Sequence, residues 1–72
     1  MALKLPKFSP IDREYPVYEL IDENNDVLLD VSRSNEGVYE IALHEGSVGR
    51  VLPLDDVLLL IQRARALLEN ET

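Results

Sequence analysis

The chain has one histidine, His44, and the residues around it decide whether this side chain could take part in chemistry. In an extended strand over residues 38–45, alternate side chains share a face, so His44 lies with Glu40. Pairing with the preceding strand brings Asp30 and Ser32 to the same face. A histidine beside a carboxylate could act as an acid–base pair. Because Ser32 lies two residue pairs away and no Gly-x-Ser-x-Gly turn occurs, we predict no catalytic residue and interpret His44 as part of an interface.

A second candidate for chemistry is a short acidic turn. Asp22, Asn24 and Asp26 match the first three ligand positions of a calcium loop. The pattern then fails, because Val27 replaces the required glycine and Arg33 the bidentate glutamate. The chain also has no cysteine, which excludes disulfides and thiolate metal sites. We therefore predict an Asn- and Asp-rich turn, with no metal and no cofactor.

The glycines of residues 46–50 could suggest a phosphate-binding loop. The segment lacks the Gly-Lys-Ser/Thr ending of such loops, and Asp55 and Asp56, at the start of the following helix, would repel phosphate. We therefore predict no phosphate site.

Charge excludes further classes of partner. The 72 residues carry 14 acidic and 7 basic side chains, for a net charge of −7. Residues 1–13 hold three basic and one acidic residue (+2), so residues 14–72 hold four basic and 13 acidic residues (−9). An acidic body repels nucleic acids and anionic membranes, so we predict no direct binding to either. No apolar run approaches the ~20 residues of a membrane span or resembles a signal peptide, which favours a cytoplasmic protein.

The elements that position these side chains follow from the hydrophobic pattern. Period-two alternation predicts strands, turn residues separate them, and a half-apolar stretch of helix-forming residues follows Pro53. Pro6 and Pro10 make the N-terminus an extended arm. The predicted segments are an arm (1–14), strands (16–22, 27–33 and 38–45), turns (23–26 and 34–37), a connection (46–49) with an optional fourth strand (50–52), and a helix (54–69).

The register of the sheet follows from the turns. A three-residue loop with Gly37 as its left-handed residue sets Val31 opposite Ile41 and Leu29 opposite Leu43. The first turn sets Leu20 opposite Leu29 and Ile21 opposite Leu28. One face of the sheet is then a predicted core face, holding Tyr18, Leu20, Leu29, Val31, Tyr39, Ile41 and Leu43.

The second face of the predicted sheet mixes apolar and acidic side chains. Glu19 and Asp30 lie directly opposite one another there, a like-charge pair that costs a few tenths of a kcal/mol. Such a face is unusual for a surface that meets only water, so the arm or a second subunit is expected to cover it. We also expect the helix to expose Leu59. The candidate interface residues are Val17, Glu19, Ile21, Leu28, Asp30, Glu40, His44 and Leu59.

These observations predict an α+β fold, in which a three-stranded antiparallel meander, four-stranded if residues 50–52 join, precedes one C-terminal helix. Residues 1–14 form the arm and residues 15–72 a single domain. A core this small favours self-association. We predict a non-enzymatic protein-interaction domain that forms homodimers. The alternatives are an acidic inhibitor or immunity-type protein that caps a basic enzyme or nucleic-acid-binding protein, and a small enzyme or ligand binder built around His44.

Overall fold

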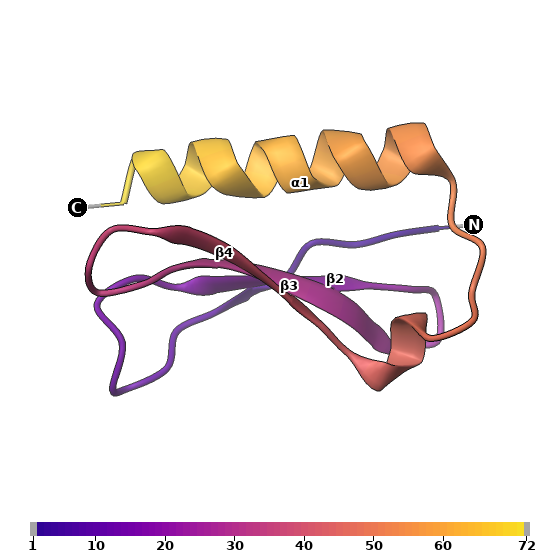
Figure 1. The fold of residues 1–72 in the computed structure, drawn as a ribbon, viewed down its shortest axis with the longest axis horizontal. Coiled ribbons are helices and arrows are strands. Elements are labelled where there is room, and N and C mark those ends of the chain that lie inside the picture. The colour runs from indigo at the N-terminus through magenta and orange to yellow at the C-terminus, as the bar shows by residue number, and fades with distance from the viewer. Residues whose placement is uncertain (1, 72) are drawn as a thin grey trace.

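A four-stranded antiparallel sheet and one helix on one of its faces make up the fold (Figure 1). The structure, a computed structural model, describes residues 2–71. The strands follow one another across the sheet in chain order, and the predicted α+β fold is confirmed. The elements are β1 (Lys7–Phe8), β2 (Val17–Ile21), β3 (Val27–Arg33), β4 (Tyr39–Leu43), the 3₁₀ helix η1 (Glu45–Ser47) and α1 (Leu54–Glu69).

The fourth strand comes from the N-terminal segment and not from residues 50–52, which form no strand. Strand β1 pairs with β2, and an isolated bridge between Lys4 and Ile21 extends this pairing. The Pro6 carbonyl accepts a hydrogen bond of 3.0 Å from the Glu19 N–H. Proline is compatible with this position because an edge strand does not need every N–H as a donor. The predicted arm thus closes one edge of the sheet.

The predicted register is confirmed except at one position. Tyr18 pairs with Val31, and on the other side Val31 pairs with Ile41. A bulge between Leu20 and Ile21 shifts Ile21 opposite Val27, whereas the sequence predicted Leu28. A bulge inserts an extra residue on one strand and is invisible to a strict two-residue period.

The two predicted turns adopt the left-handed conformations expected of them. Asn25 has φ of 67° and Gly37 has φ of 88°. These positive values account for an asparagine and a glycine at the tips of the two hairpins.

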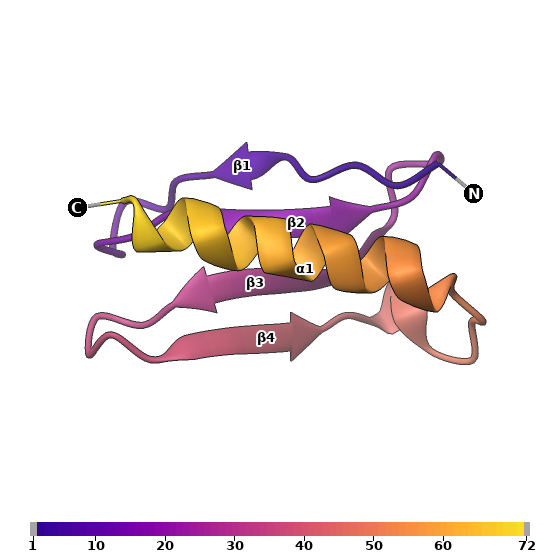
Figure 2. The same cartoon turned by 90° about the horizontal axis from the view of Figure 1, so that it is seen from above.

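The core lies between α1 and the two central strands (Figure 2). A helix is ~10 Å wide and strands are ~4.8 Å apart, so one helix covers about two strands. Of the predicted core face, Ile41 and Leu43 on β4 are 52% and 76% exposed, which corrects the prediction that β4 is covered. The buried core cluster consists of Tyr18, Leu20, Leu29, Val31, Ala64 and Leu68.

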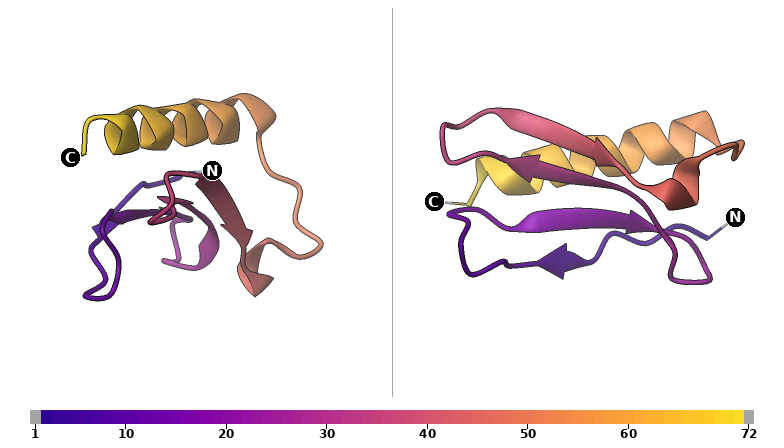
Figure 3. Two further views of the ribbon diagram at one scale, coloured as in Figure 1. Left: turned by 60° about the vertical axis from the view of Figure 1, so that its left-hand side comes forward. Right: turned by 60° about the horizontal axis from the view of Figure 1, so that its bottom comes forward.

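The opposite face of the sheet is covered at both ends by the chain itself. Residues 9–15 and η1 lie on the side away from α1 (Figures 1 and 3). A Cβ at Gly46 would stand 2.6 Å from the Val27 carbonyl oxygen, so only glycine lets η1 approach β3 this closely. Val17 and Leu28, both predicted to meet a partner, are 8% and 0% exposed. They belong to the interior of this chain and offer no surface to another.

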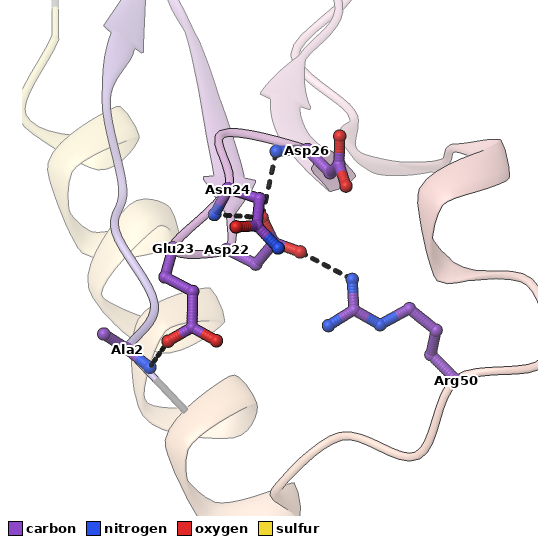
Figure 4. A network of polar contacts seen from close by, with 6 residues as sticks. All are labelled: Ala2, Asp22, Glu23, Asn24, Asp26 and Arg50. Carbon is purple, nitrogen blue, oxygen red and sulfur yellow. Dashed lines mark hydrogen bonds and ion pairs between the residues drawn. The ribbon is translucent and has the colours of Figure 1, made fainter.

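A buried carboxylate ties the first turn to the loop after η1 (Figure 4). Asp22 is 1% exposed, and its Oδ1 accepts the N–H groups of Asn24 (2.9 Å) and Asp26 (3.0 Å). Arg50 donates Nη1 to Asp22 Oδ2 at 2.6 Å. The hydrogen bond from Arg50, followed by that from the Asp26 N–H, lowers the pKa of Asp22. The acidic turn is thus held by internal donors.

The position of the core predicts unequal costs for truncating two residues of one predicted face. Leu20→Ala removes a fully buried side chain and should lower the free energy of unfolding by about 2–5 kcal/mol. Ile41→Ala removes a half-exposed side chain and should cost about 1 kcal/mol in dilute protein. Urea denaturation of both variants checks this, and equal losses would mean that β4 is covered after all.

The Asp22 contacts predict a stability loss in acid. A carboxyl whose folded-state pKa is lowered stabilises the fold above its unfolded pKa, about 4, and loses that contribution as pH falls toward the folded value. Between pH 5.5 and pH 3.5, the urea midpoint of the wild type should therefore fall further than that of Asp22→Asn. Parallel pH dependences would show that Asp22 titrates alike in both states.

Candidate protein-interaction surface

Strand β4 presents an open edge. The Ser34 N–H donates to the Val38 carbonyl (2.8 Å) and the His44 N–H donates to the Leu28 carbonyl (3.0 Å). In an antiparallel ladder, bonding groups alternate between the two sides of a strand, so the even-numbered residues of β4 bond to β3. The N–H and C=O groups of Tyr39, Ile41 and Leu43 then point outward, and no strand of residues 2–71 pairs with them.

An apolar strip lies beside this edge, on the face that carries α1. Ile61 and Arg65 line a groove with Tyr39 and Ile41 of β4. Leu54 and Leu58 continue the same stripe of the helix toward its N-terminus, since residues four or three apart share one side. We call this surface the β4 strip; its exposed members are Ile41 (52%), Leu43 (76%), Leu54 (75%) and Leu58 (47%), with Tyr39 and Ile61 partly buried beside them.

The Tyr39 end of the strip carries positive charge. The Arg33 guanidinium lies 4.6 Å from the centre of the Tyr15 ring and 5.3 Å from that of Tyr39. Arg65 stacks on Tyr39 at 4.5 Å and pairs with Glu69. Two aromatic rings therefore hold Arg33 in place, a favourable cation–π arrangement, while its buried Nε has no hydrogen-bond partner among the described residues.

The opposite edge of the sheet is protected. Strand β1 is two residues long and follows Pro6, features that discourage pairing with another chain.

Beside β1, a cluster of polar contacts joins the C-terminal end of the chain to the sheet. Lys7 Nζ donates to Glu71 Oε1 at 2.9 Å, and the Tyr18 hydroxyl donates to the same oxygen at 3.2 Å. The bond from Lys7, followed by that from Tyr18, lowers the pKa of Glu71, and the same bond raises the pKa of Lys7. Burial, followed by the bond to Glu71, raises the pKa of Tyr18.

The candidate interface residues on the second face are only partly brought together. Glu19 lies opposite Asp30 as predicted, and His44 Nε2 is 2.9 Å from Asp30 Oδ2. Glu40 is exposed on the same face, two positions along β4 from Ala42, the partner of Asp30. Ile21 is half-buried and bridges to the N-terminal segment.

Leu59 lies apart from this group. It is 58% exposed on α1, next to Leu3 and Arg63, on the other side of the sheet.

The uncovered inner face of β4 was missed by the sequence analysis. Ile41 and Leu43 follow the same alternation as Val31 and Leu29, so the pattern alone cannot separate covered from uncovered strands. The number of helices compared with the number of strands could have predicted that these side chains are exposed. One predicted helix covers about two strands. A third strand with an apolar inner face is therefore left exposed unless another element or another chain covers it.

The described residues carry neither a metal site nor a membrane helix. Within residues 2–71, no group of three or more histidine, cysteine, aspartate or glutamate side chains could hold a metal ion. In the same range, no helix has the length and apolarity required to cross a bilayer.

The direction of the β4 bonding groups predicts an alternating pattern of amide hydrogen exchange. In dilute protein the amides of Tyr39, Ile41 and Leu43 should exchange rapidly, while those of Glu40 and Ala42, bonded to β3, should be protected by tenfold or more. Exchange resolved by NMR tests this. Uniform protection along β4 would mean that the edge is covered, and uniform exchange that β4 does not hold to β3.

Comparison of the chain with protein-family models, with curated proteins and with solved structures finds no match.

Proposed function

We propose that this chain is a non-enzymatic protein-interaction domain that self-associates, by adding β4 of one copy to β4 of a second. The observation that carries the proposal is that an open strand edge and the exposed apolar β4 strip lie side by side. An unpaired edge is a template for another strand, and an apolar patch beside it supplies burial. The β1 edge is only two residues long and follows a proline, so it is a poorer template.

An antiparallel pairing centred on Ile41 fits the sequence of β4. It sets Ile41 opposite Ile41 of the second copy, Tyr39 opposite Leu43, and Glu40 opposite Ala42, so that all five residues of the strand are paired. The outward groups of Tyr39, Ile41 and Leu43 are the ones this register uses. A pairing centred on Glu40 would place two like charges directly opposite one another, which is unfavourable. The favoured arrangement is a two-fold dimer with a self-complementary interface.

The dimer would also bury the apolar side chains of β4 that α1 leaves exposed. Tyr39, Ile41 and Leu43 lie on the α1 side of the sheet, so their counterparts from the second copy would meet them there, between the two helices. Apolar area removed from water stabilises association by about 25 cal/mol per Å² before the entropy of association is subtracted. The two sheets would join into one continuous sheet with both helices on the same face.

The alternative partner, a basic protein bound by Glu19, Asp30 and Glu40, is less favoured. Asp30 already contacts His44, and its side chain is 19% exposed. An acidic cluster of this kind also has a simpler role, which is to keep a sheet face hydrated without any partner.

The proposal predicts that one charge on β4 abolishes self-association. Ile41→Lys places an ammonium group at the centre of the apolar pairing, and the dimer should dissociate at least a hundredfold more readily. Leu59→Lys is the matched control, because Leu59 is equally exposed but lies on the other side of α1. Sedimentation equilibrium over a concentration series measures both.

Three outcomes would contradict the proposal in different ways. A wild-type chain that stays monomeric at every concentration removes self-association altogether. A dimer that survives Ile41→Lys but not Leu59→Lys places the interface on the Leu59 side of the helix. A dimer that resists both substitutions moves the interface to the second face of the sheet. Circular dichroism of each variant excludes unfolding as the cause.

A further inference from the structure

We infer that His44 and Glu40 of the second copy form a contact across the proposed dimer, twice by symmetry, which strengthens self-association as the pH falls from 8 to 5.5. This inference rests on the proposed β4 pairing and adds to it the regulation of the same interface. The contact lies on the face of the sheet opposite α1, whereas the β4 strip lies on the α1 face.

His44 already uses one ring nitrogen within its own chain. Its Nε2 lies 2.9 Å from Asp30 Oδ2, and an ionised carboxylate only accepts hydrogen bonds, so Nε2 carries the proton of the neutral ring. Nδ1 is then an acceptor, and it has no hydrogen-bond partner among residues 2–71. The His44 side chain is 40% exposed, so a group from another chain has access to it.

The contact between His44 and Asp30 is a diagonal one between two strands. Asp30 pairs with Ala42, which precedes His44 by two residues on the same face of the sheet. The ladder continues to His44, whose N–H donates to the Leu28 carbonyl at 3.0 Å. Diagonal neighbours of this kind have Cα atoms ~7–8 Å apart, which is within reach of long side chains. The small side chain of Ala42 leaves the space between them open.

The proposed register repeats this relation on the other side of β4. Pairing centred on Ile41 sets Glu40 of the second copy opposite Ala42, and both residues belong to β4. Asp30 and the second Glu40 then flank the same alanine, one from each neighbouring strand, and both are diagonal to His44.

The three side chains also share a face. Glu40 and His44 lie an even number of residues apart on one extended segment, and Asp30 contacts His44 directly. The two sheets join with both helices on the same face, so Glu40 of the second copy lies on the opposite face, as His44 does. Glu40 is exposed and takes part in no ion pair within residues 2–71.

The surroundings of His44 are acidic within a single chain. The charged groups near it are Glu19 opposite Asp30, Asp26 beside η1, Glu45 in η1, Glu40 on β4 itself, and Arg50, which donates to Asp22. Dimerisation adds one more carboxylate, that of the second Glu40. Beside a neutral ring whose Nδ1 is an acceptor, this carboxylate is repelled.

A second proton on the ring reverses the sign of the contact. The imidazolium donates from Nε2 to Asp30 and from Nδ1 to Glu40 of the second copy, and hydrogen bonds between charged groups are the stronger kind. An imidazole ordinarily gains this proton between pH 8 and pH 5.5, where carboxylates stay ionised. Because the second Glu40 is present only in the dimer, the dimer binds the proton more tightly than the monomer does. Protonation therefore favours the dimer, and this contribution is lost as the pH rises.

This contact predicts a dissociation constant that depends on pH. At physiological salt, the Kd of the wild type should fall at least about fivefold from pH 8 to pH 5.5, since two contacts strengthen together. Glu40→Gln removes the charge from an exposed side chain and should change its Kd less than about twofold over this range. It should dimerise at least as tightly as the wild type at pH 8 and more weakly at pH 5.5, so the two curves cross. Sedimentation equilibrium over a concentration series at each pH gives these values.

The controls separate this contact from the proposed function. Asp56→Asn also removes one carboxylate, but beside Leu3 and Arg63 on the α1 side, and should keep the pH dependence of the wild type. His44→Gln should lose it, and if this variant fails to fold by circular dichroism, Glu40→Gln still decides.

Two results overturn the contact while the β4 dimer stands. In the first, Glu40→Gln keeps the pH dependence of the wild type, which would place its origin in the His44–Asp30 pair of one chain. In the second, the Kd of the wild type does not fall between pH 8 and pH 5.5. A wild-type chain that forms no dimer at any pH overturns both the contact and the proposed function.

Discussion

An α-helix with its side chains is about 10 Å wide, and neighbouring strands of a sheet are about 4.8 Å apart, so a single helix covers about two strands. Residues 2–71 form four strands and one α-helix, and the rest of the structure depends on that mismatch. The helix covers β2 and β3, where Leu20 and Leu29 are buried. Leu3 and Leu5 of the N-terminal segment pack beside the core on the β1 side. No element of residues 2–71 does the same on the β4 side, where Ile41, Leu43, Leu54 and Leu58 are exposed.

The second face of the sheet also lacks an element wide enough to cover all its strands. Short segments cover its two ends: residues 9–15 at one end and η1 at the other (Figure 3). Gly46 allows the close approach of η1, and the Asp22–Arg50 contact holds the loop that follows it. The centre of this face carries Glu19, Asp30 and His44, which tolerate water. The apolar residues that made this face look like an interface are explained by folding of a single chain.

The order of β2, β3 and β4, the helix and most of the register were accessible from the sequence because each depends on local signals. Gly37 fixes the second turn, and a slip of one residue would set Val31 against Glu40. The bulge before Ile21 and the pairing of Lys4 were not accessible, since both depend on contacts between segments that the pattern does not link. The exposure of Ile41 depends on where the helix axis lies, which is a property of the packed structure. The Tyr15–Arg33–Tyr39 stack likewise joins residues from a loop and two strands.

Net charge is a poor guide to how this chain would meet a second copy in the proposed dimer. Two copies of a chain with a charge of −7 repel one another at long range, but at physiological salt that repulsion is screened over about 8 Å. At contact distance the local arrangement decides, and beside β4 it consists of apolar side chains with Arg33 and Arg65 at one end. A domain of this size has a thin core and neither disulfide nor thiolate metal site to reinforce it. In the proposed dimer, the side chains that one helix cannot cover would add to the buried core, so the stability of the fold would rise with protein concentration. Self-association, as proposed here for β4, would then follow from building four strands on one helix, because the open edge and the apolar side chains beside it are what α1 leaves uncovered.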